Sequence, residues 1–175
     1  SHRTRSTAFG LLHLNRGRTV APMNAGTEPT SLPLKRLRSG AVLPAYQSTG
    51  AAGMDLCACV EESGITIQPG EIRFVPTGWA AAVPPGYEAQ IRPRSGLAGR
   101  HGMTLPTSPG TIDSDYRGEI IVPMINHGHE PFHVSQGMRI AQMVIAPVVR
   151  SVVVEVESLD QTLRGTGGFG STGVR

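Results

Sequence analysis

The sequence predicts an all-β fold made of short strands joined by tight turns. Glycine and proline are abundant, with 22 Gly and 14 Pro among 175 residues, and both interrupt regular structure. Valine and isoleucine are plentiful between them, and few stretches carry the 3.6-residue apolar period of a long helix. A chain of this length is expected to form one domain with a sizeable core.

The expected strands follow one another along the chain, separated by turn residues such as Pro69-Gly70 and Pro84-Pro85-Gly86. Apolar and β-branched runs predict them at residues 32–37, 51–60, 65–67, 72–79, 87–91, 120–126, 131–134, 138–149 and 152–156. Between the fifth and sixth of these, residues 94–99 have room for only one or two helical turns, so one short helix is expected.

Both ends of the chain are predicted to lie outside the β domain, which we place at residues 31–158. Residues 1–30 are rich in Arg, Ser, Thr and Gly without periodicity, so we expect disorder. They could be an organellar transit segment, an extension with no targeting role or an expression remnant, and the expected location is the cytoplasm, or an organelle matrix if they are a transit segment. The glycine-rich residues 159–175 are expected to be a flexible lid over a ligand, the alternative being a disordered terminus.

Charge and hydropathy exclude two classes of partner. The formal net charge is +3 and the pI is near 9.3, which is mildly favourable for anionic ligands. Four arginines of the first twenty residues contribute to this charge, and the rest of the chain has no basic cluster, so we expect no nucleic-acid partner. No apolar run reaches the roughly 18 residues of a transmembrane helix, so we expect no membrane partner.

Cysteine and histidine residues do not predict a metal site or a disulfide. Cys57 and Cys59 would share one face of a strand and cannot easily join to each other, so we expect reduced thiols in or near the core. His127, His129 and His133 could be read as a metal cluster. A turn explains them better, because no acidic residue or cysteine lies at ligand spacing for a closed site.

The most unusual stretch is residues 110–119, which hold three carboxylates, a tyrosine, an arginine and the two glycines Gly110 and Gly118. The glycines predict a tight hairpin or loop. In an extended chain Asp113 and Asp115 would share a face, which is costly without a cation, a water or a phosphate-bound metal. A solvated acidic turn is the simpler interpretation, but Tyr116 fits it poorly, since exposed turns rarely hold an aromatic ring without a packing partner.

Two other stretches carry polar groups in positions that need an explanation. Asp55 lies among apolar residues, and a buried carboxylate needs partners; backbone amides of a turn are the alternative. Arg94, Ser95 and Gly96 open the expected short helix, where free backbone N–H groups and the arginine suit an anion. Alone, this tripeptide would read as a surface turn.

Together these stretches resemble the five short motifs of the trimeric dUTPase family, and they occur in the family's order. Residues 110–119 resemble the third motif. The others are residues 52–56 (Ala-Gly-Met-Asp-Leu), 92–98 (Arg-Pro-Arg-Ser-Gly-Leu-Ala), 139–143 (Arg-Ile-Ala-Gln-Met) and 164–173 (Arg-Gly-Thr-Gly-Gly-Phe-Gly-Ser-Thr-Gly). The match spans about residues 32 to 173.

The resemblance implies a jelly-roll-like β-sandwich or barrel with one short helix, assembled as a homotrimer. Its three active sites would lie at subunit interfaces, each drawing motifs from all three chains. The implied reaction is hydrolysis of dUTP to dUMP and pyrophosphate by attack of water at the α-phosphorus, with Mg²⁺ held mainly by the triphosphate. This reaction would keep uracil out of DNA and supply dUMP for thymidylate synthesis.

Residue roles follow from the resemblance, motif by motif. Asp113 would be the general base, Asp55 would act near the metal through water, and Tyr116 would pack on the deoxyribose and exclude a 2′-hydroxyl. The implied substrate-binding residues are Arg94, Ser95, Gly96, Thr107, Gly110, Thr111, Ile112, Tyr116, Gln142, Arg164, Phe169 and Gly170. Within this set, Arg94, Ser95 and Gln142 would bind the phosphate chain, Arg164 the γ-phosphate and Phe169 the uracil, while residues 104–112 would form a hairpin that makes the uracil slot.

One residue departs from the family pattern, because many bacterial members have Asn where this chain has Thr107. The departure bears on base discrimination, since an amide offers a uracil edge both a donor and an acceptor. Among rival readings, dCTP deaminase resembles the family in fold but lacks a stretch like Asp113–Tyr116. A non-catalytic nucleotide-binding or protein-binding trimer would be marked by loss of Asp113 or of the tail, and a broader metabolite phosphatase is a third alternative.

Overall fold

The computed structural model describes residues 31–168 of the chain. The predictions for residues 1–30, and those for Phe169 and Gly170, lie outside these described residues. From Leu32 onward the described residues belong to one compact unit. It contains ten strands and one short helix, and every strand pairing is antiparallel. The predicted all-β fold with a single short helix is therefore confirmed.

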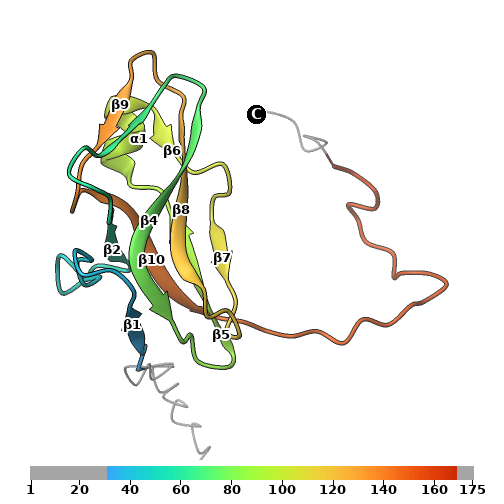
Figure 1. The fold of residues 1–175 in the computed structure, drawn as a ribbon. Coiled ribbons are helices and arrows are strands. Elements are labelled where there is room, and N and C mark those ends of the chain that lie inside the picture. The colour runs from blue at the N-terminus through green and yellow to red at the C-terminus, as the bar shows by residue number, and fades with distance from the viewer. Residues whose placement is uncertain (1–30, 169–175) are drawn as a thin grey trace, which may run out of the picture. The chain divides into compact units, whose positions relative to one another are not determined.

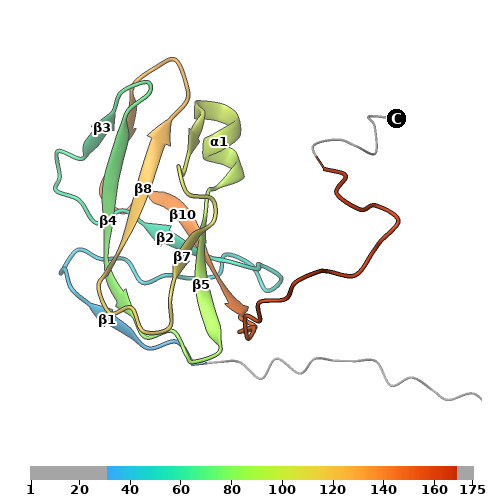
Figure 2. The same ribbon diagram turned by 90° about the vertical axis from the view of Figure 1, so that its right-hand side faces the viewer.

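The strands form two facing sheets and a small two-stranded ribbon (Figures 1 and 2). The first sheet has the order β1 (Leu34–Arg36), β4 (Ile72–Ala81), β8 (Glu119–Asn126) and β6 (Met103–Thr104). The second has the order β2 (Met54–Cys57), β10 (Arg139–Pro147), β5 (Tyr87–Arg92) and β7 (Gly110–Ile112). The ribbon pairs β3 (Ile65–Ile67) with β9 (Phe132–Val134). Both sheets are open, so the fold is a β-sandwich and not a closed barrel.

The core lies between the inner faces of the two sheets. Strand β8 shows the alternation that places it there: Ile120, Val122 and Met124 are buried, while the residues between them face outward. They belong to one apolar cluster with residues of the second sheet such as Leu56 and Met143. Burial of this cluster is the main favourable free-energy term that holds the two sheets together.

The short helix α1 (Ser95–His101) links the two sheets between β5 and β6 (Figure 2). It ends at Gly102, which adopts a left-handed conformation with φ of 67° and donates its N–H to the carbonyl of Ala98 at 3.0 Å. A Cβ at this position would lie 2.5 Å from the backbone nitrogen of Gly128. Only glycine therefore fits here, and it turns the chain directly into β6.

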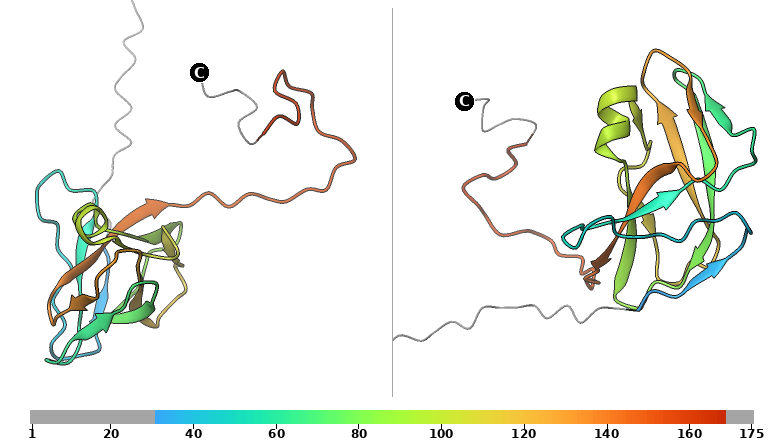
Figure 3. Two further views of the ribbon diagram at one scale, coloured as in Figure 1. Left: turned by 90° about the horizontal axis from the view of Figure 1, so that it is seen from above. Right: turned by 90° about the vertical axis from the view of Figure 1, so that its left-hand side faces the viewer.

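Several predicted elements differ from the structure. The predicted strand at residues 152–156 is wrong: the chain leaves the second sheet at the end of β10 and has no strand between Val148 and Gly168 (Figure 3). Its valines have high strand propensity, but the described part of the chain offers them no partner strand, and a strand requires one. Within the predicted strand at residues 51–60, only β2 forms regular strand structure.

No helix among residues 31–168 combines the length and the apolar character needed to cross a membrane. Both cysteines are free and buried, as expected for reduced core thiols.

Candidate active site

The first half of the candidate site is an anionic-ligand pocket of about 320 Å³ beside the end of β5. The pairing of β2, β10 and β5 builds it, because Asp55, Gln142 and Arg92 are direct cross-strand partners and so project from the same face of the sheet. Its lining comprises Gln47, Ala51, Ala52, Gly53, Asp55, Arg94, Ser95, Gly96, Arg139 and Gln142. Three of the five sequence motifs thus meet in one place.

Asp55 is the charged centre of this pocket, and two arginines hold it. Its Oδ1 lies 3.3 Å from Nε of Arg94, and its Oδ2 lies 3.1 Å from Nη1 of Arg139. The Asp55 side chain is only 12% exposed, so these pairs supply the partners that a buried carboxylate requires. One carboxylate facing two guanidinium groups leaves the pocket net positive, which suits a polyanion such as a phosphate chain.

Neighbouring residues fix the pocket's polar groups. Gln142 donates its side-chain N–H to the carbonyl of Pro93 at 3.0 Å, and Arg94 donates to the carbonyl of Arg139 at 3.0 Å. Gly53 leaves room for the Gln142 amide, since a Cβ there would lie 3.0 Å from its Oε1. A Cβ at Gly96 would meet nothing within 4 Å, so this side of the pocket is open to a ligand.

Cys57, adjacent to this pocket, is not a candidate nucleophile. Its side chain is buried, and burial together with the neighbouring Asp55 charge raises the pKa of the thiol. The thiol therefore stays protonated at neutral pH, and only the thiolate is an effective nucleophile.

The second half of the candidate site is the turn between β7 and β8, which carries Asp113 and Tyr116. The stretch is a turn rather than a paired hairpin: β7 belongs to the second sheet and β8 to the first, so the chain crosses between them here. Hydrogen bonds within the turn fix its shape, with Tyr116 N–H donating to the Asp113 carbonyl at 3.2 Å. Arg117 donates to the carbonyls of Ser114 at 2.7 Å and Tyr116 at 2.8 Å.

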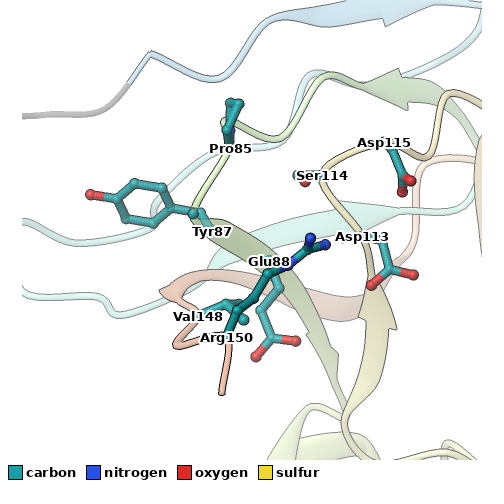
Figure 4. A pocket seen from close by; sticks show the side chains of 9 residues that line it. Pro85, Tyr87, Glu88, Asp113, Ser114, Asp115, Val148 and Arg150 are labelled. Carbon is teal, nitrogen blue, oxygen red and sulfur yellow. The ribbon is translucent and has the colours of Figure 1, made fainter. Parts of the chain in front are cut away.

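Asp113 is exposed and borders two hollows. The larger, of about 710 Å³, also receives Glu88 of β5 and Arg150 from the segment after β10 (Figure 4). The smaller, of about 190 Å³, is lined by Thr111, Ile112, Asp113, Tyr116, Glu119, Ile120 and Ile121. A carboxylate beside a small slot walled by a tyrosine can activate water next to a bound ligand.

Residues 104–112, predicted as a hairpin, do not pair with themselves. Strand β6 at one end joins the first sheet and β7 at the other end joins the second, so the hairpin is wrong and the segment is a crossing between sheets. Thr107 is exposed in the middle of this crossing, and its Oγ1 lies 3.5 Å from where a Cβ of Gly110 would be. The crossing still brings these two predicted binding residues together, next to Thr111 and Ile112.

The structure thus separates the predicted site residues into two groups on one chain. Asp55, Arg94, Ser95, Gly96 and Gln142 line the first pocket, while Thr111, Ile112, Asp113 and Tyr116 surround the slot. The first pocket contains no member of the second group, and the slot contains no member of the first. Arg164 is exposed, bonds locally to the Gly167 carbonyl at 2.9 Å and lines neither pocket.

Arg139 is a pocket residue that the sequence reasoning missed. It lies in the fourth motif, and it pairs with Cys57 in the β10–β2 ladder next to a register shift that precedes Ala141. The signal that could have found it is the need of Asp55 for cationic partners, combined with an arginine at the start of a strand in a second motif. Sequence alone does not show that β10 is the neighbour of β2.

Comparison with known proteins assigns the chain to a family. The dUTPase family model matches residues 40–173. The deoxyuridine 5′-triphosphate nucleotidohydrolase of Methylocella silvestris is 57% identical over 84% of this chain and 94% of its own length. That of Syntrophotalea carbinolica is 59% identical over 82% of this chain and 97% of its own length.

A solved structure agrees with these relatives. The dUTPase of Staphylococcus bacteriophage 80alpha with dUPNHPP is 25% identical, covers 82% of this chain and 99% of the phage chain, and superimposes with a TM-score of 0.75. Since the family model covers most of the chain and the relatives are more than half identical along nearly their whole length, this chain belongs to the dUTPase family.

Proposed function

We propose that this protein is a dUTP diphosphatase, which hydrolyses dUTP to dUMP and pyrophosphate. The observation that carries the proposal is the exposed carboxylate of Asp113 beside the Tyr116 slot, in a chain whose relatives are named deoxyuridine 5′-triphosphate nucleotidohydrolases. In the cell, the reaction would remove dUTP before it enters DNA and supply dUMP for thymidylate synthesis.

In the proposed reaction, Asp113 acts as a general base. Its carboxylate accepts a proton from a water whose oxygen attacks the α-phosphorus, and the bond from that phosphorus to the bridging oxygen breaks to release pyrophosphate. Tyr116 forms the wall against the sugar. Most of the remaining catalysis is positioning of the substrate and neutralisation of its charge. The pocket around Asp55, Arg94 and Arg139, called the arginine pocket below, would do both.

The phosphate chain would bind in the pocket around Asp55. Arg94 and Arg139 offer guanidinium donors, and Ser95, Gly96 and Gln142 offer neutral ones. The tail would complete the site, with Arg164 reaching the γ-phosphate and residues Phe169 and Gly170 closing over the uracil.

The residues present fit a magnesium ion that arrives with the substrate rather than one held by the protein alone. No group of three or more His, Cys, Asp or Glu side chains converges within residues 31–168, so this part of the chain has no closed metal cage. Mg²⁺ commonly keeps several waters and is held mainly by substrate phosphates, and Asp55 would offer its carboxylate through one of those waters. When bound, the ion would neutralise charge on the phosphate oxygens.

A homotrimer with shared sites is part of the proposal. Two observations support it: the split of the site residues on one chain, and an apolar outer face on the first sheet. On that face three cross-strand pairs are apolar on both sides, namely Ile72 with Ile125, Phe74 with Pro123 and Pro76 with Ile121. Phe74 is 69% exposed. A contiguous exposed apolar patch of this kind is typical of a surface that binds another protein chain.

The proposal is tested by measuring pyrophosphate release from dUTP, dTTP, dCTP and UTP. We expect dUTP to be strongly preferred, and Asp113→Asn to abolish turnover while a non-hydrolysable dUTP analogue still binds. Asp115→Asn is the matched control, because it removes the same charge from the same turn and should keep most activity. Retained hydrolysis in Asp113→Asn would remove that residue from its role, and equal rates on all four nucleotides would overturn the substrate assignment.

A further inference from the structure

The ring of Tyr116 lies directly on Gly118. A Cβ at position 118 would come within 2.5 Å of the ring atom Cζ, which real Cβ atoms essentially never do, and within 3.0 Å of Cε2. The backbone at 118 is not in the left-handed region, so its conformation alone does not require glycine. The absence of a side chain there therefore serves the neighbouring tyrosine ring.

The other end of Tyr116 is also fixed. Its hydroxyl donates to the backbone carbonyl of Glu119 at 3.0 Å. Without these contacts a tyrosine that is 44% exposed on a turn could choose among rotamers. The position of the Tyr116 ring is thus fixed by its contact with Gly118 and by the hydrogen bond from its hydroxyl to Glu119, the first residue of β8.

Glu119 is itself anchored to two other segments. Its carboxylate accepts two hydrogen bonds from Arg38, at 2.9 and 3.0 Å, and a third from the backbone N–H of Gly78 at 2.8 Å. Gly78 reaches it because the β4–β8 register shifts between Pro76 and Ala80, which turns this N–H toward β8. The Glu119 side chain is 15% exposed, so the bidentate pair with Arg38 is partly shielded from water.

We propose that Gly118 and the Arg38–Glu119 pair are positioning residues for Tyr116, and that they determine how strongly the site rejects a 2′-hydroxyl on the sugar. This inference rests on the proposed function. Steric rejection of one hydroxyl group requires that the Tyr116 ring stay in one rotamer, because a ring that could rotate away would admit the ribose of UTP. Tyr116 is a wall of the 190 Å³ slot, and Glu119 lines the same slot.

The first test compares kcat/KM for dUTP and UTP in the wild type and in Gly118→Ala. The added methyl should push the ring aside and lower the dUTP-to-UTP ratio about tenfold, within the range that one group in a pocket discriminates. Tm should stay close to wild type, since the contact is with the end of a half-exposed side chain. Gly99→Ala is the control: a Cβ there meets nothing within 4 Å, and the ratio should not change.

A double-mutant cycle shows whether Gly118 acts through Tyr116. Tyr116→Ala should lower the ratio by itself, and adding Gly118→Ala should change it no further. Arg38→Met should lower the ratio by a smaller factor, and Arg38→Lys should restore part of it. An unchanged ratio in Gly118→Ala, or a further fall in the double variant, would overturn the proposal.

A readout without substrate separates this inference from the proposed function. The chain has 3 tyrosines, so fluorine NMR of protein labelled with 3-fluorotyrosine gives one resonance for Tyr116, assigned with Tyr116→Phe. We expect Gly118→Ala to shift that resonance and to leave those of Tyr46 and Tyr87 in place. If it does not move, the positioning role is wrong even in an enzyme that hydrolyses dUTP; if it moves in a protein inactive on dUTP, the ring contact stands and the proposed function fails.

Discussion

At the scale of single residues, Asp55 shows how a charge in an apolar sequence context indicates a site. Its burial demanded cationic or hydrogen-bonding partners, and the structure supplies Arg94 and Arg139 at 3.3 and 3.1 Å. Removing one partner of such a pair would leave the other charge poorly compensated. In the proposed function the same arginines would also bind a phosphate chain, so structural and binding roles would share these side chains.

Thr107 is the residue at which base selectivity can be tested. We expect Thr107→Asn to keep or improve the preference for dUTP over dCTP, because an amide can donate to and accept from a uracil edge at longer reach than a hydroxyl. Thr107 is exposed, so the change should leave Tm nearly unaffected. The measurement is kcat/KM for both nucleotides, and a large loss for dUTP would show that the slot is built differently.

At the scale of elements, β8 joins the core, the candidate site and the apolar outer face. Its inward residues fill the core, and its outward residues form the apolar outer face together with β4. Its first residue, Glu119, accepts the hydrogen bond from the Tyr116 hydroxyl. The Arg38–Glu119 pair fastens this end of the strand to the segment that follows β1. Stability of the pair should therefore depend on the charge of Glu119.

We predict a pH-dependent loss of stability through Glu119. Hydrogen bonding to Arg38, and to the N–H of Gly78, lowers the pKa of this carboxyl from its ordinary value of 4.5. The stabilisation, about 1 kcal/mol for a half-exposed charged pair, is thus complete above pH 4.5 and is lost as the pH falls toward the lowered folded-state pKa. Denaturant unfolding between pH 3 and 7, at one protein concentration, checks it.

Two variants serve as comparisons in that experiment. Glu119→Gln and Arg38→Met should each flatten the acid-side part of the stability curve, because one removes the titrating group and the other removes its main partner. If both variants follow the wild-type curve in parallel, the acid-side loss arises from other carboxyl groups.

The C-terminal tail is an element without partners in the described part of the chain. Residues 164–168 are mostly exposed, and their bonds are local. Deleting residues 164–175 should therefore cut dUTP hydrolysis strongly while Tm falls little, since the deletion would remove the proposed ligand contacts and, within residues 164–168, little packing. Sedimentation of the truncated protein is the control: loss of the oligomer would show that the tail is structural instead.

At the scale of the whole molecule, the arrangement of the two half-sites concerns the oligomer. The arginine pocket and the slot beside the Asp113 turn are separate hollows on one chain. In the closed cyclic oligomer that we propose, one subunit's pocket would meet another subunit's turn at every interface, so all sites would be completed at once. The apolar outer face of β4 and β8 would supply the hydrophobic surface that such an assembly buries.

Complementation between inactive variants tests this sharing. Asp113→Asn and Arg94→Gln should each be inactive alone, and refolding them together should restore about a quarter of wild-type activity, the fraction of sites in which both contributing chains are intact. The double variant, refolded in the same way, should stay inactive. If the mixture also remains inactive although mixed oligomers form, both half-sites belong to one chain.

The sequence by itself determined the local features of this protein. Alternation and turn residues predicted most strand regions of the β domain, including β8 but not β6 or β7, together with the short helix at Ser95. Five ordered motifs predicted the family and the all-β sandwich, and both are confirmed. These properties depend on neighbours along the chain, and that is the information a single sequence displays most directly.

Only the tertiary structure decided which distant segments meet. The pairing of β10 with β2 brought Arg139 to Asp55, and the crossing between sheets replaced the hairpin at residues 104–112. Residues 152–156 have no partner strand within residues 31–168. The close fit of Tyr116 over Gly118 was likewise invisible in the sequence. Strand pairing and ring packing depend on contacts between residues brought together by the fold, and neither propensity nor periodicity encodes them.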